Sequence, residues 1–245
     1  MRTFIFSDLH ANLQATEAVF EDARRRGFDR AVCLGDLVGY GAHPNEVIDC
    51  VRELAPWRIV RGNHDKAASG VTSGATFNEF AREALRWTRE RLTPDHAAWL
   101  KALPAGPMEA EGLLLSHGSP LDEEAYILGP ADAAEAMEEV DAPIAMFGHT
   151  HLAGAFVAAA GRPPRAILLP SGGTVRLRAG ERCLLNPGSL GQPRDGDPRA
   201  SYALHDDAAG AIEVVRVAYD IDGARSAITA AGLPWLLERR LTLGV

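Results

Sequence analysis

Side chains that can bind a metal ion follow five short apolar runs of this 245-residue sequence. They are carboxylates, an amide oxygen and imidazoles, a mixture that suits manganese, iron, zinc or nickel rather than calcium. A single Asp or His at the end of a strand is more often a turn residue than a ligand, but the same ending at five places favours a metal site. The candidate ligands are Asp8, His10, Asp36, Asn63, His117, His149 and His151.

The size of this donor set predicts two ions, because the donors outnumber the positions of a single tetrahedral zinc site. Asp36 ends its apolar run between Gly35 and Gly39 and is our candidate for a carboxylate shared by both ions. A shared carboxylate would hold the ions about 3.5–4 Å apart, the spacing used for phosphoester chemistry, and each ion would lower the pKa of a bound water toward ~7.

Spacing within the blocks suggests how the donors come together. Side chains on an extended backbone alternate with a period of two, so Asp8 should point to the same side as His10, and His149 to the same side as His151. Ligands collect at the carboxyl ends of strands in open α/β sheets. We therefore expect the five strands to lie side by side, with their donors meeting at one rim.

The elements that would position these donors alternate at first between strand and helix. The order βαβαβ predicts a mostly parallel sheet with helices on its faces. Asn12 is the expected start of the first helix and Gly27 its end. The expected strands are residues 2–6, 31–34, 58–60, 113–115 and 144–147, and the expected helices are 12–26, 45–54, 78–92, 95–103 and 131–140.

Other stretches depart from this alternation. Residues 66–74 are small and polar and predict a mobile loop, a candidate lid beside Asn63. After His151, six short runs separated by Gly, Pro and Asp predict a second, largely antiparallel sheet. These runs are residues 155–158, 166–169, 175–177, 183–185, 201–204 and 212–217.

The tail contains two expected helices, residues 222–231 and 234–241. Apolar side chains of the second helix are expected to cover the core, and the alternative is a contact between two copies of the chain, a homo-oligomer. These side chains are Trp235, Leu236, Leu237 and Leu241.

Length and composition indicate one domain over residues 1–245, with the ligands in about 1–151 and the second sheet in about 152–245. The net charge of −8 and the lack of a basic stripe argue against a nucleic-acid partner. Three widely spaced cysteines suggest neither a disulfide framework nor a thiolate zinc site and favour the reducing cytoplasm. Neither a secretory signal core nor an apolar run of ~20 residues is present, so no membrane partner is expected.

Five blocks taken together resemble the calcineurin-like metallophosphoesterases. They occur in the family's order and extend over more than half of the chain; each block alone is weak, but the set is specific. The fold that the resemblance implies is a four-layer α/β sandwich, with two central mixed sheets flanked by helices. The blocks are Asp8-Leu9-His10, Gly35-Asp36-Leu37-Val38-Gly39, Gly62-Asn63-His64-Asp65, His117-Gly118 and Gly148-His149-Thr150-His151.

The resemblance also implies roles for these residues. His64 would be the general acid, which protonates the leaving oxygen while metal-held hydroxide attacks phosphorus in line. The implied cofactors are two divalent ions, manganese first, with iron, zinc and nickel as alternatives. The implied ligands are Asp8, His10 and His151 for one ion and Asn63, His117 and His149 for the other, with Asp36 bridging them.

The sequence also departs from one branch of the family. Phosphoprotein phosphatases carry Asp-Arg after Gly-Asp-x-Val and Glu after Gly-Asn-His, whereas this chain has Gly39-Tyr40 and Asp65. The carboxylate that orients the acid and the arginine that grips phosphate are missing at those positions, which favours the small bacterial phosphodiesterase-like branch. We therefore expect a cytoplasmic dimetal phosphoesterase that acts on diesters or small phosphomonoesters. The alternatives are a phosphoprotein phosphatase and a non-catalytic interaction scaffold on the same fold.

Substrate contacts are less clearly marked. Asn12 is either a substrate contact or the cap of the first helix. Asn63 is a candidate contact as well as a ligand. Arg194 either grips phosphate or belongs to a solvated loop and pairs with neighbouring acids. Tyr40 and His43 follow the bridging block and are candidates for shaping the pocket.

Overall fold

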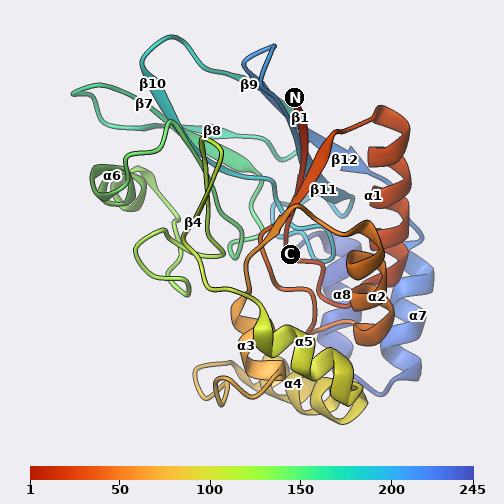
Figure 1. Ribbon diagram of the computed structural model, residues 1–245. Helices are drawn as coiled ribbons and strands as arrows, with labels where there is room; N and C mark the ends of the chain where they lie inside the picture. Colours follow the sequence, from red (N-terminus) through yellow and green to blue (C-terminus); the bar gives the residue numbers. More distant parts are fainter.

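Two six-stranded mixed sheets form the centre of the protein, whose computed structural model describes residues 1–245 (Figure 1). This confirms the fold that the resemblance implied. The first sheet has the order β3 (Arg58–Ile59), β2 (Arg30–Cys33), β1 (Arg2–Phe6), β11 (Ala200–Asp206), β12 (Ala211–Val217), β9 (Gly173–Arg176). The second has the order β4 (Met108–Ala110), β5 (Leu113–Leu115), β6 (Ile144–Met146), β10 (Glu181–Asn186), β7 (Gly154–Ala159), β8 (Arg165–Leu168).

The three N-terminal strands pair in parallel, as the βαβαβ order predicted. β1 pairs with β2 from Thr3 opposite Arg30 to Phe6 opposite Cys33, and β2 pairs with β3. The connections are α1 (Leu13–Arg26) and α2 (Pro44–Leu54). The carboxyl ends of β1 and β2 therefore lie next to each other.

Alternating side chains on the strands build the four layers. On β1, Phe4 and Phe6 pack in the core under α1, whereas Ile5 packs in the core between the sheets. On β5, Leu114 packs with the apolar residues of α6 (Pro130–Glu139), while its neighbours Leu113 and Leu115 face the first sheet. β1 and β5 are thus buried on both faces, which explains why they are continuous apolar runs.

The strands after His151 do not form a sheet of their own, so the prediction of a second, largely antiparallel sheet was wrong. β7, β8 and β10 join β4, β5 and β6, and β9, β11 and β12 extend the first sheet. β10 pairs in parallel with β6, and β11 pairs antiparallel with β1. Turn residues mark where each strand ends, but the choice of a distant partner depends on packing that composition does not reveal.

Three helices lie at one end of the sandwich: α3 (Asn63–Ala68), α4 (Glu79–Arg91) and α5 (Pro94–Ala102) (Figure 1). The prediction of a mobile loop for residues 66–74 was wrong at its start, because Lys66 to Ala68 belong to α3. Lys66 is buried and its Nζ lies 2.7 Å from Glu123 Oε1. An ion pair and a helical turn therefore hold the beginning of this segment.

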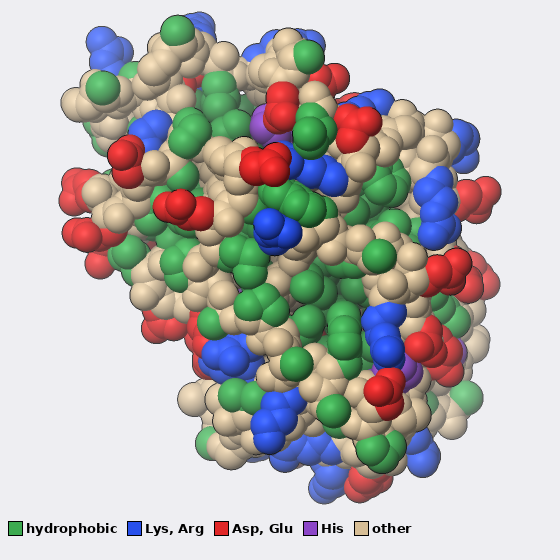
Figure 2. Space-filling view, viewed as in Figure 1, with side chains coloured by type: hydrophobic (Ala, Val, Ile, Leu, Met, Phe, Trp, Pro, Cys, Tyr) green, Lys and Arg blue, Asp and Glu red, His purple; other side chains and the backbone are tan.

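The tail forms α7 (Ile221–Ala230) and α8 (Trp235–Leu243). Leu237 and Leu241 are buried, but Trp235 is 61% exposed, so its predicted burial was wrong. α8 packs on α7, and α7 packs on α1, so only one stripe of α8 is covered. No helix combines the length and the apolar character needed to cross a bilayer. On the face shown in Figure 2, acidic and basic side chains are interspersed.

Candidate metal centre

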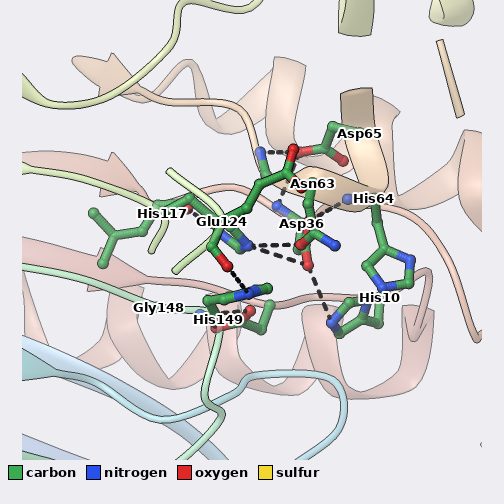
Figure 3. Close-up of polar contacts among 12 residues, drawn as sticks. His10, Asp36, Asn63, His64, Asp65, His117, Glu124, Gly148 and His149 are labelled. Carbon is green, nitrogen blue, oxygen red and sulfur yellow. Dashed lines mark hydrogen bonds and ion pairs between the residues drawn. The ribbon is translucent and has the colours of Figure 1, made fainter. Parts of the chain in front are cut away.

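The seven predicted ligands come together where β1, β2, β5 and β6 end and α3 begins. Five of them, His10, Asp36, Asn63, His117 and His149, are labelled in Figure 3. Asp36 lies between two groups of them, because its Oδ2 is 3.6 Å from His10 Nε2 and 3.3 Å from His117 Nε2. Asn63 Oδ1, a further oxygen that could bind a metal ion, lies 3.2 Å from His117 Nε2. The groups with metal-ligand spacing are Asp8, His10 and His151, and Asp36, His117 and His149.

The ring nitrogens of the first group fit a cation. His10 Nδ1 lies 3.1 Å from Val38 O, and His151 Nδ1 lies 2.6 Å from Gln192 O. A carbonyl oxygen only accepts, so both Nδ1 atoms carry the proton and a neutral ring has a bare Nε2. These two Nε2 atoms are 3.0 Å apart. Two lone pairs at that distance repel unless a cation lies between them, and metal bonds of ~2.0–2.2 Å produce such ligand spacings.

The second group is held in a related way. His117 Nδ1 donates to Leu34 O at 2.8 Å, which turns Nε2 toward Asp36. His149 is reversed, because its Nε2 donates to Glu124 O at 3.0 Å and leaves Nδ1 free. The chemistry of these donors fits a divalent ion in this group as well. His64 is also close enough to His10 and Asp36 to form a third set of neighbouring donors.

The backbone at the donors is unusual. Five predicted ligands have positive φ, which is uncommon for residues with a side chain and often marks functional sites. The backbone there is therefore not extended, so the premise of the period-of-two argument was wrong. Asp8 and His10 do lie in one group, as predicted, but His149 and His151 lie in different groups. The φ values are 57° at Asp8, 48° at His10, 55° at Asp36, 67° at His149 and 61° at His151.

Burial and neighbouring charges set the protonation of the histidines. Burial lowers the pKa of His10 well below its usual value, and burial together with His117 lowers the pKa of His149 to about 3. Both rings are thus neutral, as metal ligation requires. His117 differs, because although burial opposes it, the Asp36 carboxylate raises its pKa to about 10.

The two buried carboxylates are ionised. Burial alone would raise their pKa values, but His151 lowers the pKa of Asp8 and His117 lowers that of Asp36. Both carboxylates are therefore ionised, and a metal ion in the second group would take the place of the proton that the raised pKa leaves on His117.

Asp65 has a structural role that our sequence analysis missed. Its carboxylate accepts hydrogen bonds from the backbone N–H groups of Asp36 at 2.9 Å, Leu37 at 2.9 Å and Gly62 at 3.0 Å. It therefore fixes the loop that carries Asp36, although burial and the Asp36 charge raise its pKa to about 7. The signal in the sequence was an acid three residues after the glycine that starts a helix, as in a capping box.

His64 lies at the wall of the site and is held by aromatic packing. Its ring centroid is 4.5 Å from that of Tyr40 and 4.5 Å from that of Phe77. Burial lowers its pKa to about 4, and its Nδ1 has no hydrogen-bond partner. No carboxylate orients this ring, which agrees with the missing family carboxylate noted in the sequence.

A cavity of about 420 Å³ opens above these groups, within the ~300–1,000 Å³ range of small-molecule sites. Phe77, Glu124 and Tyr126 contribute to its wall but lie outside the sequence blocks, so motif reasoning did not find them. Residues lining it include Asn63, His64, Phe77, Tyr126, His149 and Arg194.

The predicted substrate contacts differ in their placement. Arg194 and Tyr40 line the cavity, whereas His43 precedes α2 and does not. Asn12 is also outside it, and its side chain accepts from Ala15 N at 3.1 Å and donates to Gly191 O at 2.8 Å. Of its two predicted roles, the structure therefore supports the helix cap.

The pairing predicted as the alternative role of Arg194 is absent. Asp195 pairs with Arg216, and Asp197 pairs with Arg199, so neither acid is available to Arg194.

Comparisons with known proteins agree with this geometry. The family model described as a calcineurin-like phosphoesterase superfamily domain matches residues 1–209. An uncharacterized protein of Methanocaldococcus jannaschii is 36% identical over 98% of this chain and 97% of its own length. Phosphodiesterase YfcE of Escherichia coli is 28% identical over 84% of this chain and 88% of its own.

Two solved structures share the fold along the whole chain. The crystal structure of a metallophosphoesterase from Sphaerobacter thermophilus is 39% identical, with a TM-score of 0.87 and both chains covered completely. A hypothetical protein from Pyrococcus horikoshii is 19% identical, with a TM-score of 0.81 over 100% of this chain and 98% of its own, and shows the same fold.

Proposed function

Because this chain belongs to the calcineurin-like phosphoesterase superfamily, we propose that it is a metal-dependent hydrolase of phosphodiesters or small phosphomonoesters. The observation that carries the proposal is the pair of donor groups that share Asp36. Bare imidazole nitrogens face each other in one group, and ionised carboxylates lie in both. Such a site would hold cations beside a cavity large enough for a small substrate.

Two divalent ions, manganese in our proposal, would supply positive charge for the phosphoryl oxygens and lower the pKa of a bound water. The chain's own residues would do the rest. Asp36 would fix the spacing of the two groups, and Asp65 would hold the Asp36 loop in place. His64, packed between Tyr40 and Phe77, would donate a proton to the leaving oxygen. The ligands would be Asp8, His10 and His151 in one group and Asn63, His117 and His149 in the other.

Hydrolysis of bis-p-nitrophenyl phosphate and p-nitrophenyl phosphate tests this proposal. The protein would be stripped with a chelator, reloaded with manganese and compared with Asp36→Asn and His64→Ala. We expect Asp36→Asn to lose both bound metal and activity, because it removes charge from both groups. His64→Ala should keep its metal but lose about 10²–10⁴-fold in kcat, the usual contribution of a general acid.

His96→Ala is the matched control, because His96 pairs with Asp49 away from the site and should leave kcat unchanged. The ratio of diester to monoester turnover would indicate the substrate class. Release of phosphate from phosphopeptides that is faster than diester cleavage would favour the phosphoprotein phosphatase. If wild-type protein with two bound ions cleaves neither p-nitrophenyl ester and no phosphopeptide, the hydrolase proposal is wrong and the non-catalytic scaffold is favoured.

A further inference from the structure

Arg194 is a cation without an acidic partner at the edge of the cavity. Its side chain makes one polar contact, 3.5 Å from Gln192 Oε1, which is longer than a good hydrogen bond. Its backbone N donates to His151 O at 3.2 Å, so the residue is fixed beside the Asp8 group. A half-buried guanidinium without a carboxylate favours an anion, and its planar fork matches two phosphoryl oxygens.

Tyr126 presents an aromatic face on the other side. Its ring stacks on His149, with centroids 4.1 Å apart and planes 11° apart, so His149 covers one face. The residue is nevertheless 49% exposed, and its exposed surface therefore belongs to the edge and the opposite face of the ring. Tyr126 also lines the cavity.

The segment that carries Tyr126 is anchored on both sides. Glu124 O accepts from His149 Nε2, and Glu124 pairs with the buried Lys66. Ala125 O accepts from Ser119 N at 2.9 Å, and Ile127 is buried in the core under α6. The ring is thus held in place by its neighbours, so it offers a preformed surface for stacking.

We propose, resting on the phosphoesterase function above, that the cavity selects phosphoesters of nucleosides. Arg194 contacts the phosphate and Tyr126 stacks on the base. His151 beside Arg194 and His149 beneath Tyr126 belong to different donor groups, so the two contacts lie next to different parts of the centre. Of the other two aromatic rings in the cavity, Tyr40 is buried and Phe77 is half-buried, and both pack on His64, whereas Tyr126 is 49% exposed and is therefore the ring most accessible for stacking. Nucleobases stack on such rings whatever their sequence.

Calorimetric binding to the manganese-loaded protein tests this inference with three probes: adenosine 5′-monophosphate, ribose 5-phosphate and inorganic phosphate. Wild type should bind the nucleotide about 10-fold or more tightly than ribose 5-phosphate, as expected for one stacked base. Tyr126→Ala should remove that preference without changing the affinity for inorganic phosphate. Arg194→Gln should lower the affinity for all three probes by about 10-fold or more, because each contains phosphate.

Two variants serve as controls. Tyr126→Phe keeps the ring and should keep the preference, and Leu121→Ala changes an exposed apolar residue of the same segment that does not line the cavity. Equal affinity of wild type for the nucleotide and for ribose 5-phosphate would overturn the inference. So would a Tyr126→Ala variant that loses manganese and phosphate binding together, because Tyr126 would then only position His149.

Hydrolysis of bis-p-nitrophenyl phosphate by the same wild-type sample separates the two proposals. Turnover without a preference for the nucleotide contradicts only the base subsite. A preference for the nucleotide without turnover of any ester supports the subsite and contradicts the hydrolase.

Discussion

The position of the His64 ring depends on the absence of a side chain at Gly39. A Cβ built on Gly39 would lie 2.4 Å from His64 Nδ1, and Gly39 has a φ of +90°. We predict that Gly39→Ala displaces the imidazole and lowers kcat by about 10-fold or more, since ~1 Å misplacements in active sites cost up to about 10²-fold. The manganese content should not change, and both quantities can be measured on the same sample.

Gly161→Ala is the matched control for this substitution. Gly161 has a φ of +70° but no atom within 4 Å of the added Cβ. Both substitutions place alanine in the left-handed region, which should lower the free energy of unfolding in urea by about 1–2 kcal/mol. Only Gly39→Ala should also lose activity. Equal activity of the two variants would show that Gly39 does not position His64.

Single residues were predictable from the sequence where they end an apolar run. The candidate metal donors could be found because an apolar run that stops at a carboxylate or imidazole can be recognised in the sequence alone. Tyr126 and Phe77 could not, since each is an ordinary aromatic residue in an irregular segment and reaches the cavity only through tertiary packing. Asp65 was visible in the sequence, but we considered only the glutamate that it replaces.

Between elements, a buried polar contact joins α1 to β11. Tyr202 Oη donates to Asp22 Oδ2 at 2.7 Å, and Arg26 Nε donates to the same oxygen at 2.8 Å. Burial acts to raise the pKa of Asp22, but these hydrogen bonds lower it below 3.8 in the folded protein. The ionised Asp22 therefore stabilises the fold above pH 3.8, and this contribution is lost as the pH falls through the folded pKa.

We predict that Asp22→Asn lowers the free energy of unfolding by about 1–3 kcal/mol at pH 7, the usual cost of disrupting such a buried contact. The difference between variant and wild type should shrink below pH 3.8, as measured by urea unfolding at several pH values. Asp222→Asn is the control, because the Asp222 side chain is 89% exposed and pairs only with Arg225. A difference that does not change with pH would mean that the charge of Asp22 is unimportant.

The elements themselves were largely predictable, and their partners were not. β1, β2 and β3 could be ordered because short βαβ connections leave few arrangements. β5 and β6 were expected beside them, yet they lie in the second sheet, because nothing local in residues 113–115 or 144–146 specifies the sheet to which they belong.

At the scale of the whole molecule, the candidate metal donors come from both sheets. Asp8 and Asp36 follow strands of the first sheet, whereas His117 and His149 follow strands of the second. Bound ions should therefore stabilise the packing of the sheets. We predict that a chelator lowers the Tm measured by calorimetry, since a free ion at 1,000 times its Kd adds about 4 kcal/mol.

Asp36→Asn is the control for this measurement, because manganese should shift its Tm much less. The scan should also show one transition with or without the metal, as the predicted single domain of residues 1–245 requires. Two separate transitions would contradict the single domain. A Tm that is the same with and without manganese would contradict the role of the ions in joining the sheets.

The strand order also bears on how the protein is made on the ribosome. A nascent chain that ends at His151 already carries every candidate metal donor, but β1 then lacks its neighbour β11 and β6 lacks β10. The backbone oxygen of Asp8 accepts from Ser189 Oγ at 2.8 Å and from Gly191 N at 2.9 Å, and these residues are translated later. An ion bound before Ser189 and Gly191 are translated would have ligands whose backbone lacks these hydrogen bonds. We therefore expect the centre to assemble late in synthesis, after a stage at which unpaired strand edges are exposed to aggregation.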